Sequence, residues 1–394
     1  MTLAGRAAIR ERPLAAFHRS LQERAQRKRV PVYAFVELTY GCNLRCVHCY
    51  NPTHKARGEM TTAQVRSILD GLHGEGTAFV AFTGGELFTR RDWPEVLAHA
   101  KRLGMQITVS TNATRIMREV AERLARVNPL HVKVSLYGAT RETYERVTGV
   151  RGSFRRFLAG VTRLRRRGVR VLLTSVILRE NAHEIDAMRS LCARMGLPFQ
   201  YSADIHPRVD GDRSPLRHRI DEATAHRIWR DCVAAPALRR GAFPLDPSGA
   251  PPTAPEDAPA GPDPCGGTAP AGPFACQCGR SRIVVTPYGK ANLCLSVYAP
   301  GYDLLAGSVA EGWKALVSYV DHTPATDAHE CPACPVSRFC ERTSGASFLE
   351  MGDVNACVPN HKALATLRQA WHRDAWDRPG RDPRGGGRQG KDPA

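Results

Sequence analysis

The sequence lacks any long apolar stretch. None of its 394 residues lie in a run approaching the ~20 consecutive apolar residues that a membrane-spanning helix needs. Residues 1–30 are basic, but they lack the apolar core and the small-residue cleavage site of a secretory signal. We therefore expect a cytoplasmic protein with no membrane partner.

Acidic residues are also scarce, since 38 Asp and Glu face 56 Lys and Arg, which gives a formal charge of +18. This balance favours acidic partners such as nucleic acid or an acidic peptide. The densest basic stretch is residues 152–170. Its apolar residues recur at helical spacing, so the arginines should form a solvated outer face. Aromatic residues are only 7% of the chain, and those of this stretch fall on the apolar face, so none is interleaved with the arginines on the exposed face. We therefore expect no nucleic-acid partner.

Cysteine, by contrast, is plentiful, with thirteen in the chain. Thiols in the cytosol are kept reduced, so clustered cysteines indicate metal or redox chemistry in place of disulfides. Cys42, Cys46 and Cys49 fall within the segment GCNLRCVHCY, directly after an apolar run. Three soft ligands are one fewer than a closed metal site usually takes.

Short apolar, β-branched runs alternate with amphipathic segments over the first half of the chain. Six such units in series predict a parallel sheet with right-handed crossovers, either a partial barrel or an open doubly wound sheet. Either fold places chemistry at the carboxyl ends of the strands. The predicted strands are 32–40, 79–85, 107–112, 132–138, 169–178 and 198–205, and the clearest helices are 61–76, 92–104 and 118–128.

The composition changes after a predicted helix at 223–233. A Pro-, Ala- and Gly-rich stretch that cannot bury an apolar face follows, and we read it as a linker. A compact cysteine-rich region comes next, and the chain closes with a helix and a basic tail that we expect to be disordered. The expected divisions are an N-terminal segment 1–30, a core 31–233, a linker 234–275, a cysteine-rich domain 276–360 and a C-terminal part 361–394.

The cysteine triad and the segment Thr83-Gly84-Gly85-Glu86 after the second strand together resemble the radical S-adenosylmethionine (SAM) superfamily. The resemblance implies a partial (β/α)6 TIM-like barrel. It also implies that Cys42, Cys46 and Cys49 hold three irons of a [4Fe–4S] cluster, while SAM chelates the fourth. This would explain the missing ligand, because a site that activates a substrate keeps one position open. The alternative is a zinc site with His48 or His54 as fourth ligand.

The same resemblance assigns SAM contacts to residues at the strand ends. Gly84 and Gly85 lack Cβ, so their backbone can approach the cofactor closely. The residue before the third cysteine is usually aromatic in this family and is His48 here, so either it or Tyr50 should lie near the adenine. The expected SAM-binding residues are Thr83, Gly84, Gly85, Glu86, Ser110, Asn112, Ser135, Asn181, His48 and Tyr50.

The C-terminal cysteines resemble the SPASM extension, which houses auxiliary iron–sulfur clusters. The resemblance implies an outer cluster on Cys331, Cys334, Cys340 and Cys357, and an inner cluster on Cys278, Cys294 and an upstream cysteine. The family's remaining cysteine position holds Ser344 here.

Counting the cysteines offers a replacement for that missing ligand. Cys192 and Cys232 lie in helical patterns and should be small buried hydrophobes. Eight remain outside the triad, which is two sets of four. We therefore expect Cys265 or Cys276 to replace the missing ligand, although Cys265 could equally stay free in the linker. The cofactors expected are SAM, the radical-site [4Fe–4S] cluster and one or two auxiliary clusters, which either relay electrons or bind substrate through an open iron.

The function implied is hydrogen abstraction from a residue of a ribosomally made peptide or protein, closing a cross-link or thioether or oxidising the site. Expected partners are that precursor and an electron donor such as flavodoxin or ferredoxin. The residues before the first strand are too few for a leader-binding domain, so either a separate leader-binding protein or the barrel itself should recognise the leader. Alternatives are a radical dehydrogenase, a porphyrin or small-molecule side-chain enzyme, and an iron–sulfur protein that binds nucleic acid.

Iron analysis tests the cysteine count directly. Anaerobic reconstitution should give about twelve irons per chain, because three four-iron clusters need that many. A value of about eight would show that one auxiliary site stays empty.

Overall fold

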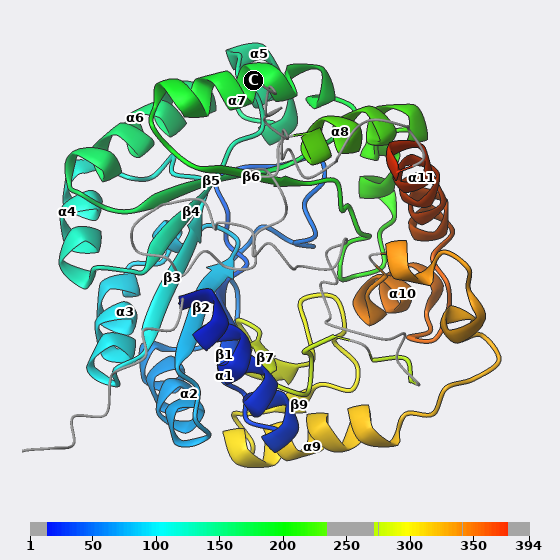
Figure 1. Ribbon diagram of the computed structural model, residues 1–394. Helices are drawn as coiled ribbons and strands as arrows, with labels where there is room; N and C mark the ends of the chain where they lie inside the picture. The colour runs from blue at the N-terminus through cyan, green and yellow to red at the C-terminus, as the bar shows by residue number, and fades with distance from the viewer. Residues whose placement is uncertain (1–13, 235–271, 275, 341, 377–394) are drawn as a thin grey trace, which may run out of the picture.

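The computed structural model describes residues 14–234, 272–274, 276–340 and 342–376. One curved sheet runs through these residues, with helices along its outer side (Figure 1). The strand order is β6-β5-β4-β3-β2-β1-β7-β8-β9. The first six strands are parallel neighbours in chain order, which confirms the expected α/β fold with a partial barrel of six parallel strands.

The core strands form where the sequence predicts them, within a few residues. Their bounds are β1 (Tyr33–Thr39), β2 (Phe79–Gly84), β3 (Gln106–Thr111), β4 (His131–Ser135), β5 (Val171–Val176) and β6 (Phe199–Ser202). Along β1, Ala34, Val36 and Leu38 are buried in the core shared with the helices. Side chains alternate across a strand, so Phe35 and Glu37 point to the opposite, concave face.

The helices follow the amphipathic segments of the sequence. In α6 (Ser153–Arg166), Phe157, Val161 and Leu164 are buried while Arg155 and Arg165 are exposed, as predicted. The remaining core helices are α1 (Leu14–Lys28), α2 (Thr62–Gly74), α3 (Trp93–Arg102), α4 (Arg118–Val127), α5 (Arg141–Thr148), α7 (Ile185–Arg194) and α8 (Glu222–Ala234).

The cysteine-rich region extends the sheet, which the sequence pattern does not predict. Strand β7 (Arg282–Val285) pairs in parallel with β1, and β8 (Lys290–Asn292) and β9 (Tyr302–Asp303) continue in antiparallel pairs. Helix α9 (Val309–His322) packs on α2, where Val309 contacts the glycine at position 71 so closely that a Cβ there would overlap it. Helices α10 (Ser344–Met351) and α11 (Pro359–Trp376) follow, and α11 packs against α8.

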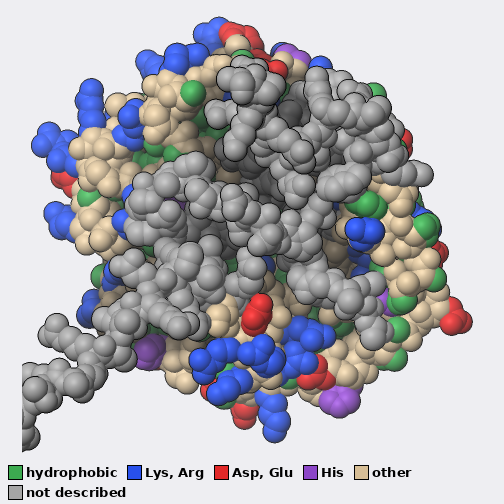
Figure 2. Space-filling view, in the orientation of Figure 1, with side chains coloured by type: hydrophobic (Ala, Val, Ile, Leu, Met, Phe, Trp, Pro, Cys, Tyr) green, Lys and Arg blue, Asp and Glu red, His purple; other side chains and the backbone are tan. Residues whose placement is uncertain are grey.

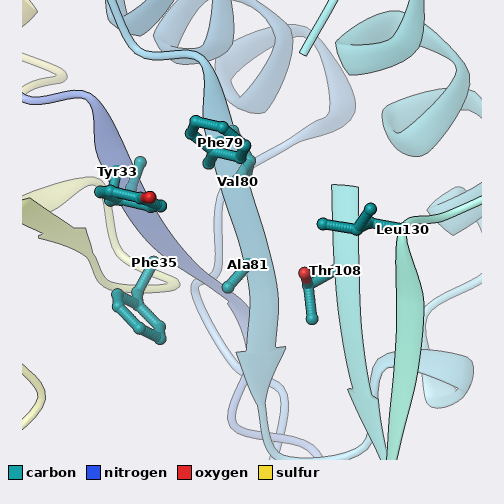
Figure 3. A pocket seen from close by; sticks show the side chains of 8 residues that line it. Tyr33, Phe35, Phe79, Val80, Ala81, Thr108 and Leu130 are labelled. Atoms are coloured by element: carbon teal, nitrogen blue, oxygen red, sulfur yellow. The ribbon is translucent and has the colours of Figure 1, made fainter. Parts of the chain in front are cut away.

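A small pocket, mostly apolar, lies on the sheet at the opposite end from the predicted chemistry (Figure 3). It is lined by Tyr33 and Phe79, the first residues of their strands, whose rings stack with centroids 4.8 Å apart, and by Leu130 before β4. Its place at the amino ends of the strands separates it from the cysteine loop. Among the described residues, no helix has both the length and the apolar content to cross a bilayer.

Helix α6 approaches the end of β3 so closely that Gly160 has no room for a side chain. A Cβ there would overlap the carbonyl oxygen of Ala113, which follows the Ser110–Asn112 segment. Gly160→Ala should therefore lower the free energy of unfolding by about 1–3 kcal/mol through overpacking, measured by thermal or denaturant unfolding.

The matched control is Gly74→Ala in α2, where a Cβ meets nothing within 4 Å. The same substitution in open helix should leave stability equal or slightly higher. Equal effects of the two substitutions would contradict the overlap.

Candidate active site

The three cysteines of the first motif lie in the loop that follows β1. The Cys42 amide donates to the His54 carbonyl at 3.3 Å, and the Cys49 amide donates to the Cys46 carbonyl at 3.1 Å. The thiols are close enough to influence one another electrostatically. Burial raises the pKa of Cys42 to about 11 and also raises the pKa values of Cys46 and Cys49. Such thiols ionise readily only when a metal binds them.

Helix α5, which the sequence analysis did not predict, holds this loop through backbone hydrogen bonds at its C-terminal end. The Arg45 amide donates to the Thr148 carbonyl at 2.9 Å, and the Val47 amide donates to the Val147 carbonyl at 3.0 Å. Two amides of the loop and two carbonyls at the end of α5 are thereby paired. The cysteine positions are therefore fixed by backbone pairing and not only by side-chain packing.

The Thr83–Glu86 segment closes against the start of the same loop. Gly84 has φ +115°, a conformation that favours glycine. A Cβ on Gly85 would lie 2.8 Å from the Tyr40 carbonyl oxygen and would overlap that of Gly41. The Gly85 amide donates to the Thr39 carbonyl at 2.6 Å, and the Glu86 amide donates to the Gly41 carbonyl at 2.8 Å. The glycines thus allow two backbone segments to pair directly.

Glu86 is fully buried, and its carboxylate gathers donors from the neighbouring strand end. The Thr111 hydroxyl donates at 2.8 Å, the Asn112 amide at 2.8 Å and the Phe88 amide at 3.2 Å. Burial raises the pKa of Glu86 while these hydrogen bonds lower it. Glu86 therefore ties the end of β2 to the end of β3. This structural role is one that the sequence reading, which placed Glu86 with SAM, did not include.

The three predicted residues at the ends of β3 and β4, Ser110, Asn112 and Ser135, have different contacts. The Asn112 side chain donates to the Asn43 side-chain oxygen at 3.2 Å, and Asn43 donates to the Thr114 hydroxyl at 2.8 Å. Ser135 hydrogen-bonds to Tyr137. Ser110 lies in register with Lys133 on β4.

Asn181 is fully buried in the loop after β5. Its side-chain oxygen accepts from the Leu178 amide at 2.8 Å, and its NH₂ donates to the Val176 carbonyl at 3.0 Å and the Tyr137 carbonyl at 3.3 Å. These bonds give Asn181 a structural role, and its contact with adenosine stays a prediction.

The two candidates for the adenine contact point in different directions. His48 packs edge-on against Tyr137, with ring centroids 4.7 Å apart, and burial lowers the pKa of His48 to about 4. Its Nδ1 is buried and has no partner among the described residues. Tyr50 instead donates its hydroxyl to Glu37 at 2.7 Å. Of the two, His48 is therefore the one with an unused buried polar atom.

The concave face of the sheet carries charged side chains that the sequence analysis overlooked. Glu37 is 2% exposed, and burial raises its pKa to about 7, against hydrogen bonds from Tyr50 and Tyr40 that lower it. On β4, burial first and then the positive charge of Arg282 on β7 lower the pKa of Lys133 to about 8. Because β4 and β7 are not neighbours, this influence acts across the curved sheet. The sequence does contain a signal for these side chains, because Glu37 and Lys133 are charged residues within mostly apolar strands.

The C-terminal cysteines fall into two groups. Cys276, Cys278 and Cys294 are joined by hydrogen bonds between their side chains, and we call them the inner group. Cys331, Cys334, Cys340 and Cys357 influence one another electrostatically and form the outer group. Burial raises the pKa of Cys340 to about 11.

Three cysteines remain outside these groups. Cys192 is 1% exposed, which confirms it as a small buried hydrophobe. Cys265 and the side chain of Cys232 lie outside the described residues, so the predictions for them stay predictions.

The thiolate donors of the three cysteine groups are the ligands that iron–sulfur clusters take. No three His, Cys, Asp or Glu side chains within the described ranges are grouped as a ready-made site for one metal ion. In a four-iron cluster each thiolate binds a different iron. Three half-buried thiols beside a glycine segment with no room for a Cβ fit a cluster with a chelating cofactor.

Comparison with known proteins agrees with this site. Residues 36–192, which contain the cysteine loop and the Thr83–Glu86 segment, match the profile described as Radical SAM superfamily. The chain is similar to Fe-coproporphyrin III synthase of Methanosarcina barkeri, at 36% identity over 41% of each chain. It is similar to the mycofactocin maturase MftC of Mycobacterium tuberculosis, at 34% identity over 46% of this chain and 49% of the relative. It thus spans about half the length of the curated relatives it matches.

Solved structures share the fold over most of the chain. Streptococcus suis SuiB bound to precursor peptide SuiA gives a TM-score of 0.60 at 15% identity, covering 88% of this chain and 80% of that one. The enzyme anSMEcpe with bound AdoMet and Cp18Cys peptide gives 0.62 at 13% identity, covering 87% and 96%. Residues 36–192, which carry the cysteine loop, thus match the Radical SAM superfamily, and the solved structures show that the fold is shared over most of the chain.

Proposed function

We propose that this protein modifies a residue of a ribosomally synthesised peptide or protein by radical SAM chemistry, forming a cross-link or thioether or oxidising the residue. The supporting observation is a cysteine loop of three thiols, joined by backbone hydrogen bonds to the glycine segment after β2. In this proposal a [4Fe–4S] cluster and SAM, when bound, supply a 5′-deoxyadenosyl radical that abstracts hydrogen from the substrate.

The chain's own residues hold and orient these groups. Cys42, Cys46 and Cys49 would bind three irons, and the carbonyls of Gly84 and Gly85 would accept from the cofactor's ammonium group. Ser110, Asn112 and Ser135 stand at the carboxyl ends of β3 and β4, the edge of the sheet that also carries the cysteine loop, and they would contact the cofactor there. Because backbone hydrogen bonds already fix the loop, it should lose little conformational entropy when the cofactor binds.

A peptide substrate is favoured by the fold and the charge. The solved structures of similar fold include SuiB with a precursor peptide and anSMEcpe with a peptide. Lys and Arg side chains gather where α1 lies, in the lower part of Figure 2. Arg24, Arg27 and Lys28 are exposed there, a surface suited to an acidic leader. An electron donor such as flavodoxin or ferredoxin and a separate leader-binding protein belong to the same proposal.

A porphyrin is the second candidate substrate. Fe-coproporphyrin III synthase is among the similar proteins at 36% identity. The cations Lys133 and Arg282 on the concave face would suit a carboxylate of a porphyrin or of an acidic residue equally.

A two-arm assay separates the substrates. The reconstituted enzyme is given either the short peptide encoded beside its gene or a carboxylate-bearing iron porphyrin other than the Fe-coproporphyrin III that the named relative makes, and the products are analysed by mass spectrometry. The proposal expects a mass change in the peptide only. A change confined to the porphyrin would replace the peptide by the second candidate.

Reductive cleavage of SAM tests the shared chemistry. The reconstituted enzyme with a strong reductant should release 5′-deoxyadenosine, measured by chromatography. The variant C42A/C46A/C49A should release none above the level of iron-free protein, because three iron ligands are lost. Cys192→Ala, which removes a buried thiol remote from the loop, should keep the activity. Cleavage by the triple variant would overturn the proposal.

Glu37 should make stability depend on pH. Its folded-state pKa of about 7 lies above the ordinary value of 4.5, so the unfolded chain loses the proton first as pH rises. Stability should therefore fall between about pH 4.5 and 7, by up to about 3 kcal/mol. Glu37→Gln should lack this decline. The check is thermal unfolding of both cluster-free proteins across that range, and parallel curves would show that Glu37 titrates normally.

A further inference from the structure

Ser344 stands where the family pattern has its remaining cysteine, and the structure brings it to the inner group of Cys276, Cys278 and Cys294. We propose that the inner cluster is held by these three thiolates alone, so that one of its irons takes a soft external donor such as a thiolate. This inference rests on the auxiliary clusters of the proposed function.

The three thiols form one compact group. Cys276 hydrogen-bonds to Cys278, which also hydrogen-bonds to Cys294. Cys278 is 7% exposed and forms a β-bridge with Arg282, and Cys294 forms one with Val297. The group is therefore held by backbone pairing at the root of β7, beside the concave face that Arg282 reaches.

The start of α10 lies directly against this group. A Cβ on Gly345 would lie 2.9 Å from the Sγ of Cys294 and 2.8 Å from the Cβ of Ser296. Ser344 precedes Gly345, is 2% exposed and begins the helix. The residue at position 344 thus stands beside the inner group, where a cysteine would be the natural fourth ligand.

The Ser344 hydroxyl is already committed to another partner. It donates to the Pro273 carbonyl at 2.7 Å, and Pro273 leads into the segment that carries Cys276 and Cys278. A hydroxyl that donates keeps its proton, and it is a far weaker iron ligand than a thiolate. Ser344 therefore positions the cysteine segment and leaves the cluster one thiolate short.

The contrast with the outer group supports this assignment. The outer group has four cysteines that influence one another, which is a full ligand set. Beside the inner group lie the hydroxyl of Ser296, next to Gly345, and the guanidinium of Arg282, whose charge lowers the pKa values of Cys276 and Cys278. Neither a hydroxyl nor a guanidinium competes with a soft donor for iron.

The experiment uses full-length, anaerobically reconstituted C42A/C46A/C49A protein, in which only auxiliary clusters contribute to the EPR spectrum. The probe is ¹³C-labelled cyanide. One reduced cluster should show ¹³C coupling, and mild oxidation should convert one cluster to the [3Fe–4S] form, because an iron without a thiolate is lost first. Adding Ser344→Cys should abolish both signals, since the fourth thiolate closes the cluster.

Two matched variants in the same background test the alternatives. Ser344→Ala removes the hydroxyl without adding a thiol, and it should keep both signals. A cyanide-free spectrum altered by Ser344→Ala, with circular dichroism unchanged, would mean that the serine oxygen is a ligand. Cys265→Ser should also change nothing, and new cyanide binding in that variant would identify Cys265 as the fourth ligand.

Failure of this inference differs from failure of the proposed function. Cyanide coupling that persists in Ser344→Cys would overturn the inference alone. Absence of iron from the C42A/C46A/C49A protein would overturn both the inference and the auxiliary clusters.

Discussion

The site depends on one contact between backbones, the approach of the segment after β2 to the start of the cysteine loop. The amides of Gly85 and Glu86 donate to the carbonyls of Thr39 and Gly41 at 2.6 and 2.8 Å. A Cβ on Gly84 or Gly85 would overlap the carbonyl oxygen of Thr39 or Gly41 respectively. The Glu86 carboxylate in turn accepts hydrogen bonds from Thr111 and Asn112, which hold the end of β3 against the end of β2. Three strand ends are thereby fixed relative to the thiols.

Much of this arrangement could be predicted from local sequence patterns. Alternation of apolar runs with amphipathic segments gave six strands in order, because buried parallel strands and outer helices have distinct periodicities. The turn residues marked helix ends correctly, and Gly76, Gly104 and Asn128 all have positive φ. The placement of the cysteine loop and Thr83–Glu86 at one edge follows from parallel strand topology alone.

What could not be predicted depends on contacts between distant segments. Strand β7 is only four residues long, and its pairing with β1 depends on a partner some 250 residues away. Helix α5 is short and polar, and its value lies in the carbonyls of Val147 and Thr148 that the cysteine loop uses. The pKa values of Glu37 and Lys133 are shifted only because the folded, curved sheet buries both side chains. Local patterns carry no information about such enclosure.

The parallel pairing of β7 with β1 also bears on how the chain can be divided. Strand β1 carries the cysteine loop, and in this fold both of its edges are hydrogen-bonded, one to β2 and the other to β7. A fragment ending before residue 272 would expose a row of unpaired amides and carbonyls along β1, next to α2 stripped of its contact with Val309. Open strand edges invite association with other chains. Residues 282–285 thus complete the hydrogen bonding of β1. The two cysteine-bearing regions share one sheet, and neither can be removed without leaving a strand edge of the other unpaired.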